Sequence, residues 1–82
     1  MITERIILWD TKYGVIKSCL KDILDTRGIS LYQLSRLSDL RYEVVYRYYH
    51  NEVQRYDSEV LAKLCYVLNC HISDLIKYES SN

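Results

Sequence analysis

One short stretch, residues 28–34 (Gly-Ile-Ser-Leu-Tyr-Gln-Leu), constrains the fold more than any other part of this sequence. Gly28 can adopt the left-handed backbone conformation that closes the C-terminus of a helix. Ser30 and Gln33 have the spacing of a capping box, in which each side chain accepts a hydrogen bond from a backbone N–H group at the start of a helix. The stretch therefore predicts that one helix ends and the next begins within about two residues.

Apolar residues at helical spacing predict the helices on either side of this stretch. The preceding helix is expected to begin near Val15 and to end at Arg27, whose positive charge suits the C-terminal end of a helix dipole. Its apolar stripe consists of Val15, Ile16, Cys19, Leu20, Ile23 and Leu24. The following helix is expected to be short and to end near Ser38, because Ser38 and Asp39 favour turns.

Two further helices are predicted near the C-terminal end of the sequence. Asp57 and Ser58 are capping residues in front of an apolar stripe, and Asn69 is expected to end that helix. The stripe consists of Val60, Leu61, Leu64, Cys65, Val67 and Leu68. A last short helix is expected to carry Ile72, Leu75 and Ile76 on its apolar side.

Residues 40–56 contain five tyrosines and three arginines, and their local signals conflict. Alternation between Tyr42 and Tyr48, together with the strand preference of valine and tyrosine, favours a half-buried strand. Helical spacing instead places Val45, Tyr48 and Tyr49 on one face. We predict a helix here, because a lone strand among four helices would leave its backbone hydrogen-bonding groups unpaired. The chain then has five helices, and a tight turn joins the second to the third.

Residues 15–78 resemble the Cro and phage-repressor class of helix-turn-helix DNA-binding domains. Two motifs carry the resemblance. The first is Gln33-Leu34-Ser35-Arg36, in which the small Ser35 stands where the family usually has alanine so that two helices can approach closely. The second is residues 64–78 (LCYVLNCHISDLIKY), in which a helix ends in leucine-asparagine-cysteine and an aspartate-leucine turn follows.

The resemblance implies an all-α, five-helix, lambda-repressor-like helix-turn-helix domain over residues 14–78. A short N-terminal arm or strand, residues 1–13, would precede this domain, and a polar tail, residues 79–82, would follow it. The sequence departs from the family pattern at Asp39, where the turn commonly has glycine. It departs again at Arg41, which replaces the serine or threonine that caps the recognition helix.

The resemblance also implies which residues face DNA. The third helix, near residues 41–50, corresponds to the recognition helix that enters the major groove. The expected DNA-facing residues are Arg36, Arg41, Tyr42, Glu43, Tyr46, Arg47 and His50. Arginine can bridge the two acceptors of guanine, and tyrosine can contact phosphates or thymine methyl groups. Residues 29–55 carry a local charge of only about +1, so modest affinity and a shallow salt dependence are expected.

These residues predict a sequence-specific DNA-binding transcriptional regulator, in the first instance a repressor, with double-stranded DNA as its partner. A second interpretation stays open. The same arginine and tyrosine face would suit a protein partner, because both residue types are enriched at binding hot spots. The chain would then be a protein-binding accessory factor of the antitoxin or anti-repressor type.

Composition excludes several other classes of protein. Eleven cationic and eleven anionic side chains leave no net charge that would draw the whole chain onto a polyanion or a membrane. The apolar run from Ile6 to Trp9 is far shorter than the roughly 20 residues of a membrane span. Nothing in the sequence indicates catalysis, so no enzyme, cofactor or metal site is expected. The three cysteines are an odd number without paired spacing, which indicates a reducing, cytoplasmic location.

The first thirteen residues are too apolar for an idle tail, because they include Ile2, Ile6, Ile7, Leu8 and Trp9. One hypothesis is that this segment is an extended arm or strand that packs against a second copy of the chain and makes a homodimer. The alternative is that the arm folds back onto its own core.

Overall fold

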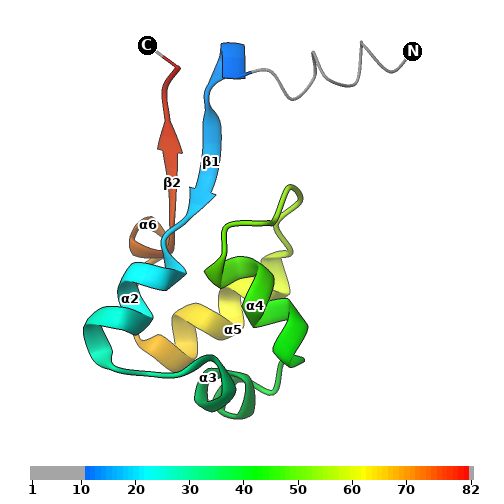
Figure 1. Ribbon diagram of the computed structural model, residues 1–82, viewed down its shortest axis with the longest axis vertical. Helices are drawn as coiled ribbons and strands as arrows, with labels where there is room; N and C mark the ends of the chain where they lie inside the picture. Colours follow the sequence, from blue (N-terminus) through cyan, green and yellow to red (C-terminus); the bar gives the residue numbers. More distant parts are fainter. Residues whose placement is uncertain (1–10, 82) are drawn as a thin grey trace.

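The computed structural model describes residues 11–81, in which strands from near the two ends of the chain lie side by side in a small antiparallel sheet (Figure 1). Five α-helices lie between the strands in sequence and form the body of the molecule. The elements are η1, a 3-10 helix (Thr11–Tyr13), β1 (Val15–Ser18), α2 (Leu20–Arg27), α3 (Leu31–Ser38), α4 (Tyr42–Tyr49), α5 (Ser58–Leu68), α6 (Ile72–Leu75) and β2 (Ile76–Glu79). Within residues 11–81, no helix is long and apolar enough to cross a membrane.

All five helices contribute side chains to one hydrophobic core. Its buried members are Leu20, Leu24, Leu34, Val45, Tyr48, Leu64, Leu68 and Leu75. Burying a leucine, valine or aromatic side chain of this size stabilises the fold by about 1.5–3 kcal/mol each. Because every helix is short, this shared burial holds the helices together more than their intrinsic propensity does.

The helix boundaries confirm the local signals in the sequence. Gly28 ends α2 in the left-handed conformation, with φ 68°. At the start of α3, Ser30 Oγ accepts from the Gln33 backbone N–H at 3.1 Å, and Gln33 Oε1 accepts from the Ser30 N–H at 2.9 Å. Asp57 caps α5, because its Oδ1 accepts from the Glu59 N–H at 2.8 Å. The helix predicted near residues 41–50 is present as α4, and the strand alternative is wrong.

The prediction of a helix beginning at Val15 is wrong for the first four residues. Val15–Ser18 form strand β1, which pairs with β2 so that Ile16 lies opposite Tyr78. Ile76 likewise begins β2 and does not continue α6. The apolar spacing of this region fits a helix as well as a strand. An extended backbone is stable here only because β2 pairs with its N–H and C=O groups. The fold is therefore mostly helical with a two-stranded sheet, and is not purely all-α.

Hydrogen bonds at the base of the sheet, called here the terminal ribbon (β1 and β2), attach it to the helical body. The Cys19 N–H donates to Leu75 O at 2.7 Å, where β1 meets α2. The Ser18 N–H donates to Asn51 Oδ1 at 2.8 Å, just beyond the end of α4. The Tyr56 hydroxyl donates to Ile16 O at 3.4 Å. The ribbon projects from one end of the helical body (Figure 1).

The prediction for the N-terminal arm falls mostly on residues 1–10, which lie outside the described residues. Residues 11–13 form η1. The proposed division into residues 1–13, 14–78 and 79–82 stays a prediction.

Candidate nucleic-acid interface

The turn between α3 and α4 sets how the two helices sit against each other, and Ser35 holds it. Asp39 takes the left-handed conformation, with φ 57° and ψ 39°, and its N–H donates to Ser35 O. The Leu40 N–H donates to the same carbonyl at 3.2 Å, and the Ser35 hydroxyl donates back to Leu40 O at 2.6 Å. Ser35 thus satisfies three backbone groups of the turn. The sequence indicated only its small size, and missed this role of its hydroxyl.

The inner face of α4 is anchored in the core through Val45 and Tyr48, two of the three residues that helical spacing placed on one face. Both side chains are buried. The Tyr48 hydroxyl accepts from the Asp57 N–H at 3.0 Å, at the start of α5. Its ring packs edge-on against Tyr56, with 5.7 Å between ring centroids. Fixing the inner face in this way also fixes which side chains of α4 point outward.

The outer face of α4 carries a line of aromatic rings one helical turn apart. Tyr42, Tyr46 and His50 are all exposed. The ring centroids of Tyr42 and Tyr46 are 6.2 Å apart, and those of Tyr46 and His50 are 4.2 Å apart. These three residues are called here the aromatic ladder. Adjacent rings are tilted by 40° and 45° to each other, so the ladder presents a row of aromatic edges and faces with polar atoms among them.

Three arginines lie on or beside this face. Arg41 is the N-cap of α4, with an extended backbone, and its side chain makes no capping hydrogen bond, as expected from the loss of a serine or threonine there. Arg47 is exposed near the C-terminal end of α4. On α3, Arg36 is held by Tyr32: Arg36 donates to the Tyr32 hydroxyl at 3.0 Å, and its guanidinium lies 5.6 Å from the ring centroid.

The seven predicted DNA-facing residues are thus all exposed, and they fall into groups. Glu43 shares the first turn of α4 with Tyr42, and acidic groups favour that end of a helix dipole. The aromatic ladder joins three of the seven. Tyr32, the partner of Arg36, was missed in the sequence, although its spacing of four residues from Arg36 was a usable signal.

A cavity of about 430 Å³ lies between α4 and the following loop. Arg47 and Arg55 line it together with Glu52 and Asp57. Arg55 was not among the predicted site residues. Because two acidic groups accompany the two arginines, this end of the site has little net positive charge, which agrees with the weak charge balance of the sequence.

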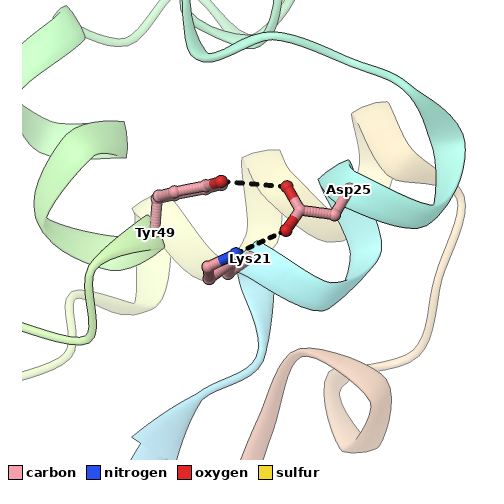
Figure 2. A network of polar contacts seen from close by, with 3 residues as sticks. All are labelled: Lys21, Asp25 and Tyr49. Atoms are coloured by element: carbon pink, nitrogen blue, oxygen red, sulfur yellow. Dashed lines mark hydrogen bonds and ion pairs between the residues drawn. The ribbon is translucent and has the colours of Figure 1, made fainter.

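A polar network ties α4 to α2 (Figure 2). Tyr49 donates its hydroxyl hydrogen to Asp25 Oδ1 at 2.9 Å, and Lys21 Nζ donates to Asp25 Oδ2 at 2.6 Å. The Lys21 ammonium also lies 5.5 Å from the centroid of the Tyr49 ring. The hydrogen bonds from Lys21 and Tyr49 lower the pKa of Asp25, and the carboxylate raises the pKa of Tyr49 by accepting a hydrogen bond from its hydroxyl group. Sequence reasoning missed this network.

Among residues 11–81, no group of three or more histidine, cysteine or acidic side chains is arranged to hold a metal ion. The three cysteines are free thiols, and Cys19 is buried as the sequence suggested. The surroundings of α4 combine a turn closed by hydrogen bonds, a buried inner side, and an outer side of arginine and aromatic residues.

Together, the tight turn and the exposed second helix define the class of helix-turn-helix proteins. The family model of the Cro/C1-type HTH DNA-binding domain matches residues 19–81, more than three quarters of the chain. The chain therefore belongs to the Cro/C1-type HTH DNA-binding domain family, and the resemblance found in its sequence is confirmed. A comparison with curated proteins found no significant match. The family is one of DNA-binding domains and is typically non-enzymatic.

Proposed function

We propose that this chain is a sequence-specific transcriptional regulator, in the first instance a repressor, that places α4 in the major groove of double-stranded DNA. The observation that carries the proposal is the division of α4 into two faces. Val45 and Tyr48 are buried in the core, while the aromatic ladder and Arg47 are exposed on the same helix. A helix of this kind can enter the groove without exposing any of its core.

Each exposed side chain has a contact that its chemistry suits. Arg41 and Arg47 bind guanine edges, because a guanidinium can donate two parallel hydrogen bonds to O6 and N7. Tyr42 and Tyr46 lie against thymine methyl groups or donate to phosphates. Glu43 accepts from the amino group of cytosine. Arg36 and His50 contact the backbone at the two ends of the site, where they set the position of the helix on DNA.

The low local charge favours binding as a homodimer. A single copy neutralises few phosphates, so its affinity for one half-site is modest. Two copies would place their α4 helices about one DNA turn apart, roughly 34 Å. Joining the two half-sites raises affinity without any new contact to DNA. The described residues next to the N-terminal arm offer an apolar surface for this purpose, because Ile16 and Tyr78 of the terminal ribbon are 47% and 63% exposed.

Sedimentation equilibrium at tens of micromolar protein tests the dimer. We expect a dimer mass for the full chain and a monomer mass after deletion of residues 1–10. Circular dichroism of the shortened chain checks that the helices remain. A monomer mass for the full chain would remove the dimer and leave the arm as a segment that folds onto its own core.

The first experiment for the function is selection of binding sites from a random duplex library at about 100 mM salt, where the Debye length is roughly 10 Å and surface contacts still count. A palindromic motif is expected, and the distance between its halves reports the spacing of two α4 helices. No enrichment by a folded protein would overturn the proposal.

Once a DNA site has been selected from the library, Arg47→Ala tests the role of α4. Loss of a bidentate base contact should weaken specific binding by about 5- to 150-fold, equivalent to about 1–3 kcal/mol. Lys63→Ala on α5 is the control, because it also removes one cation from a helix but lies outside the predicted DNA-facing residues. Equal affinities of the two variants for the selected site would remove Arg47 from the site.

A second candidate function rests on the near-neutral charge of the same face. Tyrosine and arginine without a surplus of positive charge also suit a protein partner, as in an antitoxin or anti-repressor. Recovery of a stable protein partner at high salt, with no DNA motif from the selection, would favour this function.

The proposed location is the cytoplasm. A protein that binds DNA acts in the compartment that holds the DNA, and three free thiols suit a reducing compartment.

A further inference from the structure

The C-terminal cap of α5 brings two cysteines together. Asn69 takes the left-handed conformation, with φ 51° and ψ 54°. The Cys70 N–H then donates to Cys65 O at 3.1 Å. This hydrogen bond between the sixth and the first residue is the mark of a Schellman motif, in which the side chains of those two residues commonly contact each other. In this chain both of those side chains are thiols.

The surroundings of the two thiols decide how readily they react. Cys65 and Cys70 are both free and both half-buried, so small molecules can reach them. The backbone hydrogen bond at the cap holds Cys65 and Cys70 close together, whereas burial raises the pKa of the Cys70 thiol, so that its reactive thiolate forms at alkaline pH. Cys70 also lines a surface cavity of about 330 Å³ between α2 and α6, together with Arg27 and Asp74. Neither cysteine belongs to the proposed DNA-binding face.

We propose that Cys65 and Cys70 form a dithiol site that a low-molecular-weight disulfide, such as oxidised glutathione, converts to an intrachain disulfide. One cysteine thiolate attacks the small disulfide, forms a mixed disulfide and releases the first small thiolate, which takes up a proton. The second cysteine thiolate attacks the protein sulfur of that mixed disulfide and releases the second small thiol. Two protein thiols are oxidised, one small disulfide is reduced to two thiols, and the atoms balance.

The bond would close the cap of α5 covalently. Its ring would enclose Leu68, whose carbonyl accepts a hydrogen bond from Arg27 at the end of α2. A cross-link over so few residues restricts the unfolded chain, and in the folded chain the backbone hydrogen bond from Cys70 to Cys65 already holds the two residues close together. The oxidised protein should therefore be more stable to heat, while its affinity for DNA stays the same.

The test treats the reduced, folded full chain with oxidised glutathione at mildly alkaline pH and follows it by mass spectrometry and peptide mapping. The wild type should lose two hydrogen atoms and yield a single cross-linked peptide pair joining Cys65 to Cys70. The variants Cys65→Ser and Cys70→Ser should instead accumulate a mixed disulfide with glutathione, because each lacks the second thiol. This trapping separates a dithiol site from two unrelated cysteines.

Three results would overturn the proposal: a stable mixed disulfide in the wild type, a cross-link to Cys19, or no reaction until denaturant is added. A thermal scan adds an independent readout, since the oxidised protein should melt several degrees higher than the reduced one. An unchanged or lower melting temperature would remove the stabilising role of the bond. Neither readout depends on DNA, so failure here leaves the Arg47 test of the proposed function intact.

Discussion

The helix-turn-helix unit, α3 and α4 with their turn, and the terminal ribbon are held together in opposite ways. In the helix-turn-helix, Leu34 and Val45 are completely buried, and Ser35 satisfies the turn from within the same short stretch. In the ribbon, Ile16 and Tyr78 face each other across the pair but stay largely exposed. The first unit is stabilised by burial and nearby hydrogen bonds. The second depends on partners that are about sixty residues away in the sequence.

The charged side chains also make the ribbon the less stable of the two units. Lys17 and Lys77 lie directly opposite each other in the ribbon, an unfavourable pairing of like charges. Lys17 relieves it by pairing with Glu79 at 2.9 Å, and Lys77 donates to Ser73 O at 3.3 Å. Two strands alone are marginally stable in water. The ribbon should therefore open before the helical body does, and the following predictions test that order.

The largest effect is expected from Leu34→Ala, which opens a cavity in the core beneath the helix-turn-helix. Loss of about 2–5 kcal/mol from the free energy of unfolding is expected, as measured by urea titration. Leu37→Ala is the matched control, because Leu37 lies on the same helix and is 65% exposed. It should change stability by no more than about 0.5 kcal/mol. Similar losses for both variants would contradict the assignment of Leu34 to the core.

Substitutions at the two glycines with positive φ test the ribbon and the helical body independently. A Cβ atom on Gly14, with φ 84°, would lie 2.5 Å from Glu79 O, whereas nothing lies within 4 Å of one on Gly28, with φ 68°. Gly14→Ala should therefore open the ribbon, with loss of amide protection in β1 and β2 while the core amides remain protected. Gly28→Ala should keep the ribbon and cost about 1–2 kcal/mol of overall stability, the strain of a left-handed alanine.

If Gly14→Ala lowers the protection of the core amides as much as that of the ribbon, the two regions unfold as one unit. The ribbon would then not open before the helical body.

Asp39 gives a smaller effect, of opposite sign, within the helix-turn-helix. A non-glycine residue in the left-handed conformation carries a strain of roughly 1–2 kcal/mol. Glycine removes this strain, but its greater conformational freedom in the unfolded chain offsets part of the gain in stability. Asp39→Gly should therefore stabilise the protein by up to about 1 kcal/mol in urea titration. Asp39→Ala is the control and should destabilise it. Destabilisation by glycine would mean that the Asp39 side chain supports the turn in a way that its backbone does not reveal.

The smallest effect concerns the network between α2 and α4. Its hydrogen bonds from Lys21 and Tyr49 lower the pKa of Asp25 in the folded state. The stability it contributes is therefore present above the pKa of Asp25 in the unfolded chain, and is lost as the pH falls through the lower folded-state pKa. In Tyr49→Phe the folded-state pKa of Asp25 should rise toward its ordinary value, as followed by NMR of the carboxyl carbon. Tyr46→Phe should leave it unchanged, and a shift there would point to a cause other than the hydrogen bond.

Short-range chemistry explains which parts of this fold could be predicted. The capping residues Gly28, Ser30 and Gln33 act on backbone groups no more than five residues away, so their roles can be predicted from the sequence. Asp57 and Asn69 cap α5 for the same reason. The family followed from residues in and around these caps. The exposed side chains of α4 were identified by helical spacing and resemblance, and their contacts with DNA stay a prediction.

What the sequence determined by itself is therefore the set of helices, their caps and the helix-turn-helix family. Tertiary structure decided that Val15–Ser18 form a strand, because a period of apolar residues cannot distinguish a helix from a strand until Ile76–Glu79 offers its hydrogen bonds. It also decided that Tyr49 binds Asp25, since the two belong to helices whose approach depends on the whole core. Local hydrogen bonds act on neighbours along the chain, whereas these contacts exist only after distant segments have packed together.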